Sequence, residues 1–293
     1  MVHEHNLKQQ SSDSNSTGLL MLNKTIAFIG AGNMTHSIIS GLVNANYPAE
    51  RIIASNPSTN KLESLRSDFA INTTQDNHFA VENAHVVVLA VKPQLMEDVC
   101  ADLSKHCDLQ DKLFVSIAAG INHQRLQQML GGNYPLVRTM PNTPSMLSKG
   151  MTGLYAPSDV SADDKNLVQM IMQSVGETLW VEEEADIDLV IATAGSSPAY
   201  FFLFLEAMQN HAIELGMDKN ASRKLVQQAM LGAAEMVCHN PTLEINELRA
   251  QVTSKGGTTA KAIEHFQAQQ LEKIIAGAMD AAILRAGQMA KQF

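Results

Sequence analysis

The feature that most constrains this fold is a glycine-containing turn, Gly30-Ala31-Gly32-Asn33-Met34. The apolar run from Thr25 to Ile29 precedes it and predicts a short buried strand. An apolar-periodic stretch that includes Ile38 and Leu42 follows it and predicts a helix. Dinucleotide-binding folds place a pyrophosphate at a strand, glycine turn and helix in this order.

Each glycine of the turn has a separate expected task. Gly30 makes the tight turn, Gly32 lets the backbone approach the phosphates, and the N–H groups at the start of the helix, at Asn33 and Met34, bind the anion. Thr35 stands where the full pattern has its third glycine. An ordinary glycine turn with no ligand is therefore the alternative.

Apolar strands alternate with helical stretches through the first half of the chain. Such near-continuous apolar strands predict a parallel sheet covered on both faces, so we expect an α/β, doubly wound, Rossmann-like domain over residues 22–182. The expected strands are 25–29, 52–54, 86–91, 113–117, 136–140 and 150–155. The two clearest helices are 95–105 and 123–130.

The pattern changes after Trp180, where Glu182-Glu183-Glu184 predicts an acidic hinge. Helical periodicity dominates beyond it, so we expect an all-α domain over 183–293, with helices at 203–215, 221–238 and 271–289. About one hundred helical residues cannot bury many apolar stripes among themselves, which indicates that some pack on a second subunit. Residues 1–21 are rich in Ser, Asn and Gln and are expected to form a disordered tail.

Composition excludes several classes of protein. The net charge is −9 and no basic half or stripe is present, which argues against a nucleic-acid or membrane-surface partner. No uncharged apolar run was found to approach the roughly 20 residues that span a bilayer. Three cysteines are too few for a disulfide framework and indicate a cytoplasmic protein. The histidines are scattered without metal-ligand spacing, so no metal site is expected.

The end of the second strand bears on the choice of cofactor. An NAD site places a carboxylate there, whereas this strand ends in Ser55 and Asn56, with Lys61 close behind. A 2′-phosphate can be accommodated in such a setting, which favours NADPH, with NADH as the alternative. A simple turn remains the other interpretation of these residues.

Three more strands end in turns on the same expected edge. Ala90-Val91-Lys92-Pro93 ends one strand, and turns containing Ala118 and Asn142 end the next two. Ligands of open α/β folds bind at this carboxyl edge. Each of these segments alone is explained by an ordinary turn after a strand, but their recurrence on one edge of the sheet favours a ligand-binding site.

Two segments stand out in the helical half. Ser197 is expected as the N-cap of a helix with Pro198 in its first position. The segment Ser254-Lys255-Gly256-Gly257-Thr258-Thr259 is expected to lead into a helix that begins near Ala260. Its free N–H groups and hydroxyls could hold a carboxylate, and plain helix capping is the alternative. Phe201 to Phe204 and the Met-rich stretches are expected in the core.

The ordered set GAGNM, AVKP, SIAAG, MPNTP, GSSPAY and SKGGTT resembles the pyrroline-5-carboxylate reductase family from about Lys24 to near the C-terminus. The resemblance implies a Rossmann domain, a helical dimerisation domain and a homodimer that can assemble further into a decamer. It also implies reduction of 1-pyrroline-5-carboxylate to L-proline, the last step of proline biosynthesis.

Residue roles follow from the same resemblance. The substrate carboxylate is expected on Ser254, Gly256, Gly257, Thr258 and Thr259, with Thr259 and water as one route for a proton. Ala90, Lys92 and Asn142 are expected on the nicotinamide side, and Asn56 beside the adenosine ribose or its phosphate. The cofactor residues together are Gly30, Gly32, Asn33, Met34, Ser55, Asn56, Ala90, Val91, Lys92, Pro93, Ala118 and Asn142.

The sequence departs from the family pattern at Thr35, Ser37, Ser197 and Lys255. Lys255 replaces a proline and adds a charge to the loop expected to hold the carboxylate. Two alternatives are kept: a β-hydroxyacid dehydrogenase and a catalytically idle NADP(H)-binding regulator. The first needs a lysine in the helical domain, and the stretch from Asn166 to Asp218 contains none.

Overall fold

The computed structural model describes residues 23–292, so the expected tail over 1–21 lies outside the described residues. The described chain forms two compact units. The first comprises residues up to Gly195 together with the end of the last helix from Ile283, and the second runs from Ser196 to Ala282.

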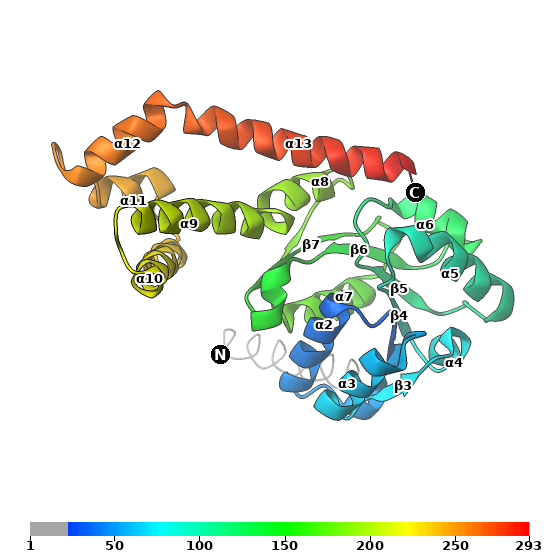
Figure 1. Ribbon diagram of the computed structural model, residues 1–293. Helices are drawn as coiled ribbons and strands as arrows, with labels where there is room; N and C mark the ends of the chain where they lie inside the picture. Colours follow the sequence, from blue (N-terminus) through cyan, green and yellow to red (C-terminus); the bar gives the residue numbers. More distant parts are fainter. Residues whose placement is uncertain (1–22, 293) are drawn as a thin grey trace, which may run out of the picture. The chain divides into compact units, whose positions relative to one another are not determined.

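The first unit contains an eight-stranded sheet in the order β3-β2-β1-β4-β5-β6-β7-β8 (Figure 1). All neighbouring strands are parallel except β6 and β7, which are antiparallel. The strands are β1 (Ile26–Ile29), β2 (Ile52–Ser55), β3 (Asn72–Thr74), β4 (Val86–Leu89), β5 (Leu113–Ser116), β6 (Leu136–Met140), β7 (Gly150–Tyr155) and β8 (Gly176–Trp180).

Helices cover both faces of this sheet, because the central strands are apolar on both sides and must be buried on both. Side chains such as Ile39, Leu65 and Ile171 form one core with one face of the sheet, and Met96, Leu103 and Leu126 belong to the core on the other. The helices of the first core are α2 (Asn33–Asn44), α3 (Thr59–Phe69) and α7 (Ala162–Gln173), and those of the second are α4 (Asn77–Glu82), α5 (Pro93–His106) and α6 (His123–Leu130). The doubly wound fold is as expected.

Strand order places the functional edge. The chain runs from β1 outward through β2 and β3 and then returns to β4 on the other side of β1. This reversal creates a switch point between β1 and β4 at their carboxyl ends, where open α/β sheets bind ligands. The loops after β1 and β4 therefore meet, as the hydrogen bond from the Ala90 N–H to the Ile29 carbonyl shows.

Two of the strands, β3 and β8, were not predicted from the sequence. β3 is short and consists of Asn72, Thr73 and Thr74, which carry no apolar pattern. β8 is half-exposed, and its Glu177 and Thr178 interrupt the apolar run that marks a buried strand. Both are outermost strands, where burial on two faces is not required.

A buried ion pair joins the sheet to the segment that follows β8. Arg138 of β6 lies 2.6 Å from the Glu184 carboxylate and is almost fully buried. The same Glu184 oxygen accepts a hydrogen bond from the backbone N–H of His123 at the start of α6. Glu184 is thus not a solvated hinge residue; it neutralises a buried guanidinium and helps to satisfy a helix N-terminus.

The helical region begins with α8 (Asp186–Val190), a π-helical turn (Ile191–Gly195) and α9 (Ser197–Glu214). The expected N-cap at Ser197 is wrong by one residue: the cap is Ser196, in helical conformation, because the π-turn runs almost directly into α9. In a continuous α-helix the N–H of residue 198 would bond the Ala194 carbonyl, but Pro198 has none. The Asn142 side chain donates to that carbonyl at 2.9 Å instead.

The remaining helices are α10 (Lys219–Cys238), α11 (Ile245–Gln251), α12 (Thr258–Ala268) and α13 (Leu271–Gln292). The second unit leaves many large apolar side chains exposed. The expectation that Phe201 to Phe204 lie in the core is wrong for a single chain, since Phe202 and Leu203 are about two-thirds exposed and α9 has no buried residue.

By length and composition alone, one helical segment of the described chain, Asp186–Glu214, could cross a membrane. This corrects the expectation that no apolar run approaches such a length; the sequence predicts a helix start at Ser197, in the middle of the segment. A helix that is buried within a protein can have the same length and composition.

Candidate functional site

The turn after β1 has the geometry that a bound phosphate needs. Gly30 has φ +112°, a conformation that L side chains rarely adopt, and a Cβ on it would lie 2.6 Å from the Ala90 carbonyl oxygen. Only glycine fits there. Gly32 differs, because an added Cβ would meet no atom within 4 Å. Gly32 therefore faces open space, as a residue must if a ligand is to approach its backbone.

Helix α2 begins at this open space with its first N–H groups turned toward it. Its N-cap is Gly32, and no side chain caps the helix. Asn33 and Met34 occupy the first two helical positions, so their N–H groups have no partner within the helix. Together with the positive end of the helix dipole, such N–H groups suit an anion.

The hydroxyls that replace small residues in this motif are accommodated locally. Thr35 is buried and donates to the Gly30 carbonyl at 2.8 Å. Ser37 donates to the Asn33 carbonyl at 3.0 Å. Each added hydroxyl has an acceptor on the adjacent backbone, so neither substitution leaves a buried polar group unsatisfied.

A groove of about 490 Å³ lies against the start of α2 and continues along α3. Its size is that of a small-molecule site. Lys61 and Met146 are among its lining residues, and Lys61 is exposed. The full lining is Ala31, Gly32, Asn33, His36, Ser37, Ser40, Asn60, Lys61, Ser64, Leu65 and Met146.

The two residues expected at the end of β2 take different roles. Asn56 accepts from the Ala31 N–H at 3.2 Å and donates to the Ser58 carbonyl at 3.3 Å, so it ties the glycine turn to the loop after β2. Ser55 is fully buried and donates to the Asn77 side chain at 2.7 Å. Ser55 therefore orders the strand end and does not line the groove.

The other expected cofactor residues follow neighbouring strands at the same edge. Lys92 is the exposed N-cap of α5, and Pro93 is its first residue, directly after the turn that follows β4. Ala118 is buried after β5. Asn142 follows β6 and is also buried; its Oδ1 accepts from the Met151 N–H at 2.9 Å while its amide group holds Ala194. The nitrogen and the oxygen of the Asn142 side-chain amide thus each bind a backbone group of another segment.

The sequence analysis missed several groove residues. His36 and Ser40 stand four residues apart on α2, and Asn60 and Ser64 do so on α3. This spacing puts each pair on one helical face. A polar face beside a glycine turn was the available signal, although Gly32, Asn33 and Lys61 of the lining were expected.

The glycine-threonine corner, residues 254–259, lies in the second unit. Helix α12 begins at Thr258, two residues before the expected start near Ala260, and its N-cap is Gly257. Gly256 has φ +74°, which reverses the chain before the helix. No side chain caps α12, and both threonines are exposed. Ser254, Gly256 and Gly257 thus lead directly into a helix that begins with Thr258 and Thr259, and a helix start of this kind suits an anion.

A doubly wound sheet with an uncapped helix behind a glycine turn is typical of a dinucleotide-binding domain. Residues 25–120 match the family model described as NADP oxidoreductase, coenzyme F420-dependent, and residues 184–289 match pyrroline-5-carboxylate reductase dimerisation.

The relatives extend this over more than nine-tenths of the chain. A pyrroline-5-carboxylate reductase from Vibrio alginolyticus is 55% identical over 93% of this chain and 100% of its own length. A solved pyrroline-5-carboxylate reductase from Coxiella burnetii is 40% identical with a TM-score of 0.86, covering 91% of this chain and 98% of that one. The reductase from Plasmodium falciparum, solved with NADP bound, is 28% identical with a TM-score of 0.81, covering 92% and 98%. This chain belongs to the pyrroline-5-carboxylate reductase family, which confirms the resemblance drawn from the six motifs.

Proposed function

We propose that this protein reduces the C=N bond of 1-pyrroline-5-carboxylate to give L-proline, with NADPH as the hydride donor. The 55% identity to the Vibrio reductase along that enzyme's whole length carries the proposal. The open backbone at Gly32 and the uncapped start of α2 support the cofactor assignment, since they fit a pyrophosphate.

We assign the nucleotide to the groove of the first unit. Gly32, Asn33 and Met34 bind the pyrophosphate through their backbone, and Asn56 holds the turn in place. The Lys61 ammonium contacts the 2′-phosphate, since it is the cation among the groove-lining residues and follows a strand end without a carboxylate. Ala90, Lys92 and Asn142 lie toward the nicotinamide.

We assign the substrate carboxylate to the glycine-threonine corner of the second unit. We place the boundary between the two functional domains between residues 182 and 183. The N–H groups and hydroxyls of Thr258 and Thr259 bind the anion, and Lys255 adds a favourable charge. NADPH supplies a hydride to the imine carbon. The iminium form brings its own proton on nitrogen, so the protein's task is orientation and exclusion of water.

We further propose that the chain works as a homodimer in the cytoplasm, with a decamer as a higher assembly. The homodimer is supported by the match to a dimerisation domain and by the exposed apolar side chains of α9. The cytoplasmic location is supported by the three free cysteines. The apolar segment Asp186–Glu214 is then a subunit interface. Sedimentation mass tests it, and a 31.8 kDa particle would contradict it.

Substrate assignment is tested by Thr259→Ala. Loss of a hydrogen bond to a charged group costs about 1.5–3 kcal/mol, so we expect KM for pyrroline-5-carboxylate to rise about 10-fold to 150-fold while the NADPH Kd stays unchanged. Thr253→Ala is the matched control, because Thr253 donates to the Arg249 carbonyl at the end of α11. Equal KM values for the two variants would contradict the assignment of Thr259 to the substrate site.

The remaining candidates are separated by one pair of assays. A reductase oxidises NADPH when pyrroline-5-carboxylate is added, whereas a β-hydroxyacid dehydrogenase reduces NADP⁺ with 3-hydroxyacids. An idle regulatory protein binds NADPH and does neither.

A further inference from the structure

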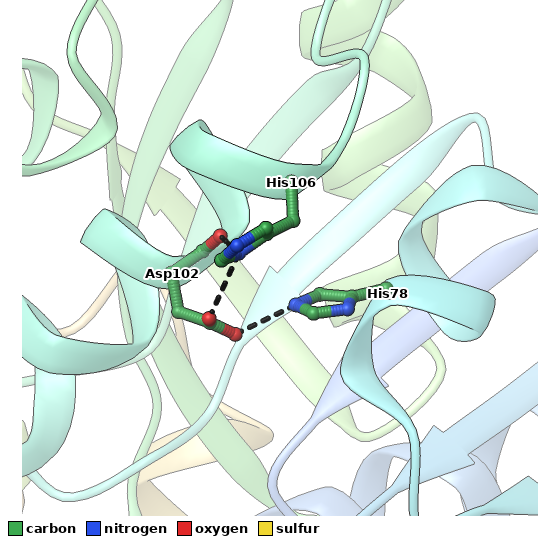
Figure 2. A group of neighbouring side chains, drawn as sticks. All are labelled: His78, Asp102 and His106. Carbon is green, nitrogen blue, oxygen red and sulfur yellow. Dashed lines mark hydrogen bonds and ion pairs between the residues drawn. The ribbon is translucent and has the colours of Figure 1, made fainter.

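A cluster of two histidines and one aspartate lies on α4 and α5, apart from the residues assigned to the cofactor and the substrate. Figure 2 shows His78 of α4 and His106 of α5 on either side of the Asp102 carboxylate. The His78 Nε2 atom lies 2.7 Å from one carboxylate oxygen, and the His106 Nδ1 atom lies 3.1 Å from the other. The three ligand atoms all fall within 4.8 Å of one another.

We propose that His78, Asp102 and His106 form a binding site for a divalent transition-metal ion, with Zn²⁺ as the best fit. Two imidazoles and a carboxylate are a ligand set that zinc takes with water in its fourth position. Imidazole nitrogen selects against Mg²⁺ and Ca²⁺, which prefer oxygen ligands. The side chains are between about a third and a half exposed, which leaves the fourth position open to water.

The helices hold the ligands in a suitable arrangement. Asp102 and His106 are four residues apart on α5 and so project from one face of a single helix. His78 comes from the second residue of α4, whose start is fixed by Asp76, since its carboxylate accepts from the N–H groups of His78 and Phe79. Two ordered helices thus supply the three ligands, and an ion would join α4 to α5.

The surroundings favour a cation. The Asp76 carboxylate lies 3.9 Å from His78 Nδ1, on the side of the ring away from Asp102, in the place where an outer carboxylate orients a metal-bound histidine. No lysine or arginine pairs with Asp102 among the ion pairs of the described residues.

Zinc titration of the full-length protein tests the site. His3 and His5 near the N-terminus could bind metal on their own, so the reference protein carries His3→Ala and His5→Ala. We expect one Zn²⁺ per chain by isothermal titration calorimetry and a higher melting temperature with zinc. His78→Gln and His106→Gln, each made in that reference, should weaken binding about 10-fold or more.

The matched control is His239→Gln. His239 also lies beside a carboxylate four residues away on a helix, Glu235, but forms no cluster with a second histidine. Because no second histidine clusters with it among residues 23–292, this variant should leave zinc binding unchanged. Circular dichroism and NADPH-dependent activity of the two site variants without added zinc verify that they are folded. Absence of stoichiometric binding in the reference protein, or equal affinity in all variants, would overturn the proposal.

Discussion

Replacing Gly32 by alanine separates the folding of the glycine turn from its use in binding. Gly32 has φ −84° and ψ 178°, which alanine adopts without strain, and the added methyl group would meet no protein atom within 4 Å. Alanine is a poorer N-cap than glycine, but it also reduces the entropy of the unfolded chain. These opposed effects leave the free energy of unfolding within about 1 kcal/mol of wild type.

The same methyl group occupies the space that the phosphates must enter. If one charge-assisted hydrogen bond from the start of α2 is lost, binding weakens by about 1.5–3 kcal/mol, which is about a 10-fold to 150-fold rise in the NADPH Kd. Fluorescence titration with NADPH measures the affinity, and thermal unfolding without cofactor measures stability.

Gly30→Ala is the contrasting variant. Its φ of +112° costs an alanine about 1–3 kcal/mol, and the Cβ would also press on the Ala90 carbonyl oxygen at 2.6 Å. This variant should lose stability as well as NADPH affinity. A Gly32→Ala protein with unchanged stability and an unchanged NADPH Kd would refute the placement of the phosphates at this turn.

Three further predictions follow from single side chains. Lys61→Ala should raise the Kd for NADPH about 3-fold to 10-fold and leave that for NADH unchanged, as parallel fluorescence titrations would show, because its ammonium is assigned to the 2′-phosphate. Glu184→Ala should lower stability by about 2 kcal/mol in urea unfolding, since it leaves the buried Arg138 guanidinium unpaired; a change near zero would contradict this. Burial raises the pKa of the Cys100 thiol to about 12, so at pH 8 iodoacetamide should label it only in denaturant, and mass spectrometry would reveal any labelling of the native protein.

Local sequence patterns were sufficient for the Rossmann-like architecture. The apolar strands β1, β4 and β5 are fully buried, so composition alone marked them. Strand β7 was expected at 150–155, but its antiparallel pairing with β6 was not. The outer strands β3 and β8 were not expected, since their neighbours in the sheet and not their own composition decide their pairing. The near-continuous run from α8 into α9 was hidden by the serines and proline at its centre.

The candidate site was predictable where backbone conformation dictates the residue type. Gly30 and Gly256 need positive φ, and glycine marked both positions in the sequence. Side-chain partners were not predictable, because they depend on loops distant in the chain. The Ser55 hydroxyl donates to the Asn77 side chain, and the Asn142 side chain bonds the backbone of Ala194 and Met151, partners that the sequence did not predict. The proximity of His78 to Asp102 and His106 was not predictable either, because His78 lies 24 residues before Asp102 on another helix.

Transfer of deuterium from NADPH labelled at both C4 positions to the product tests the central claim most directly. The purified protein, given this cofactor and unlabelled 1-pyrroline-5-carboxylate, should form L-proline that carries one deuterium at ring C5, the former imine carbon, as read by mass spectrometry. No proline, or proline without the label, would contradict the account.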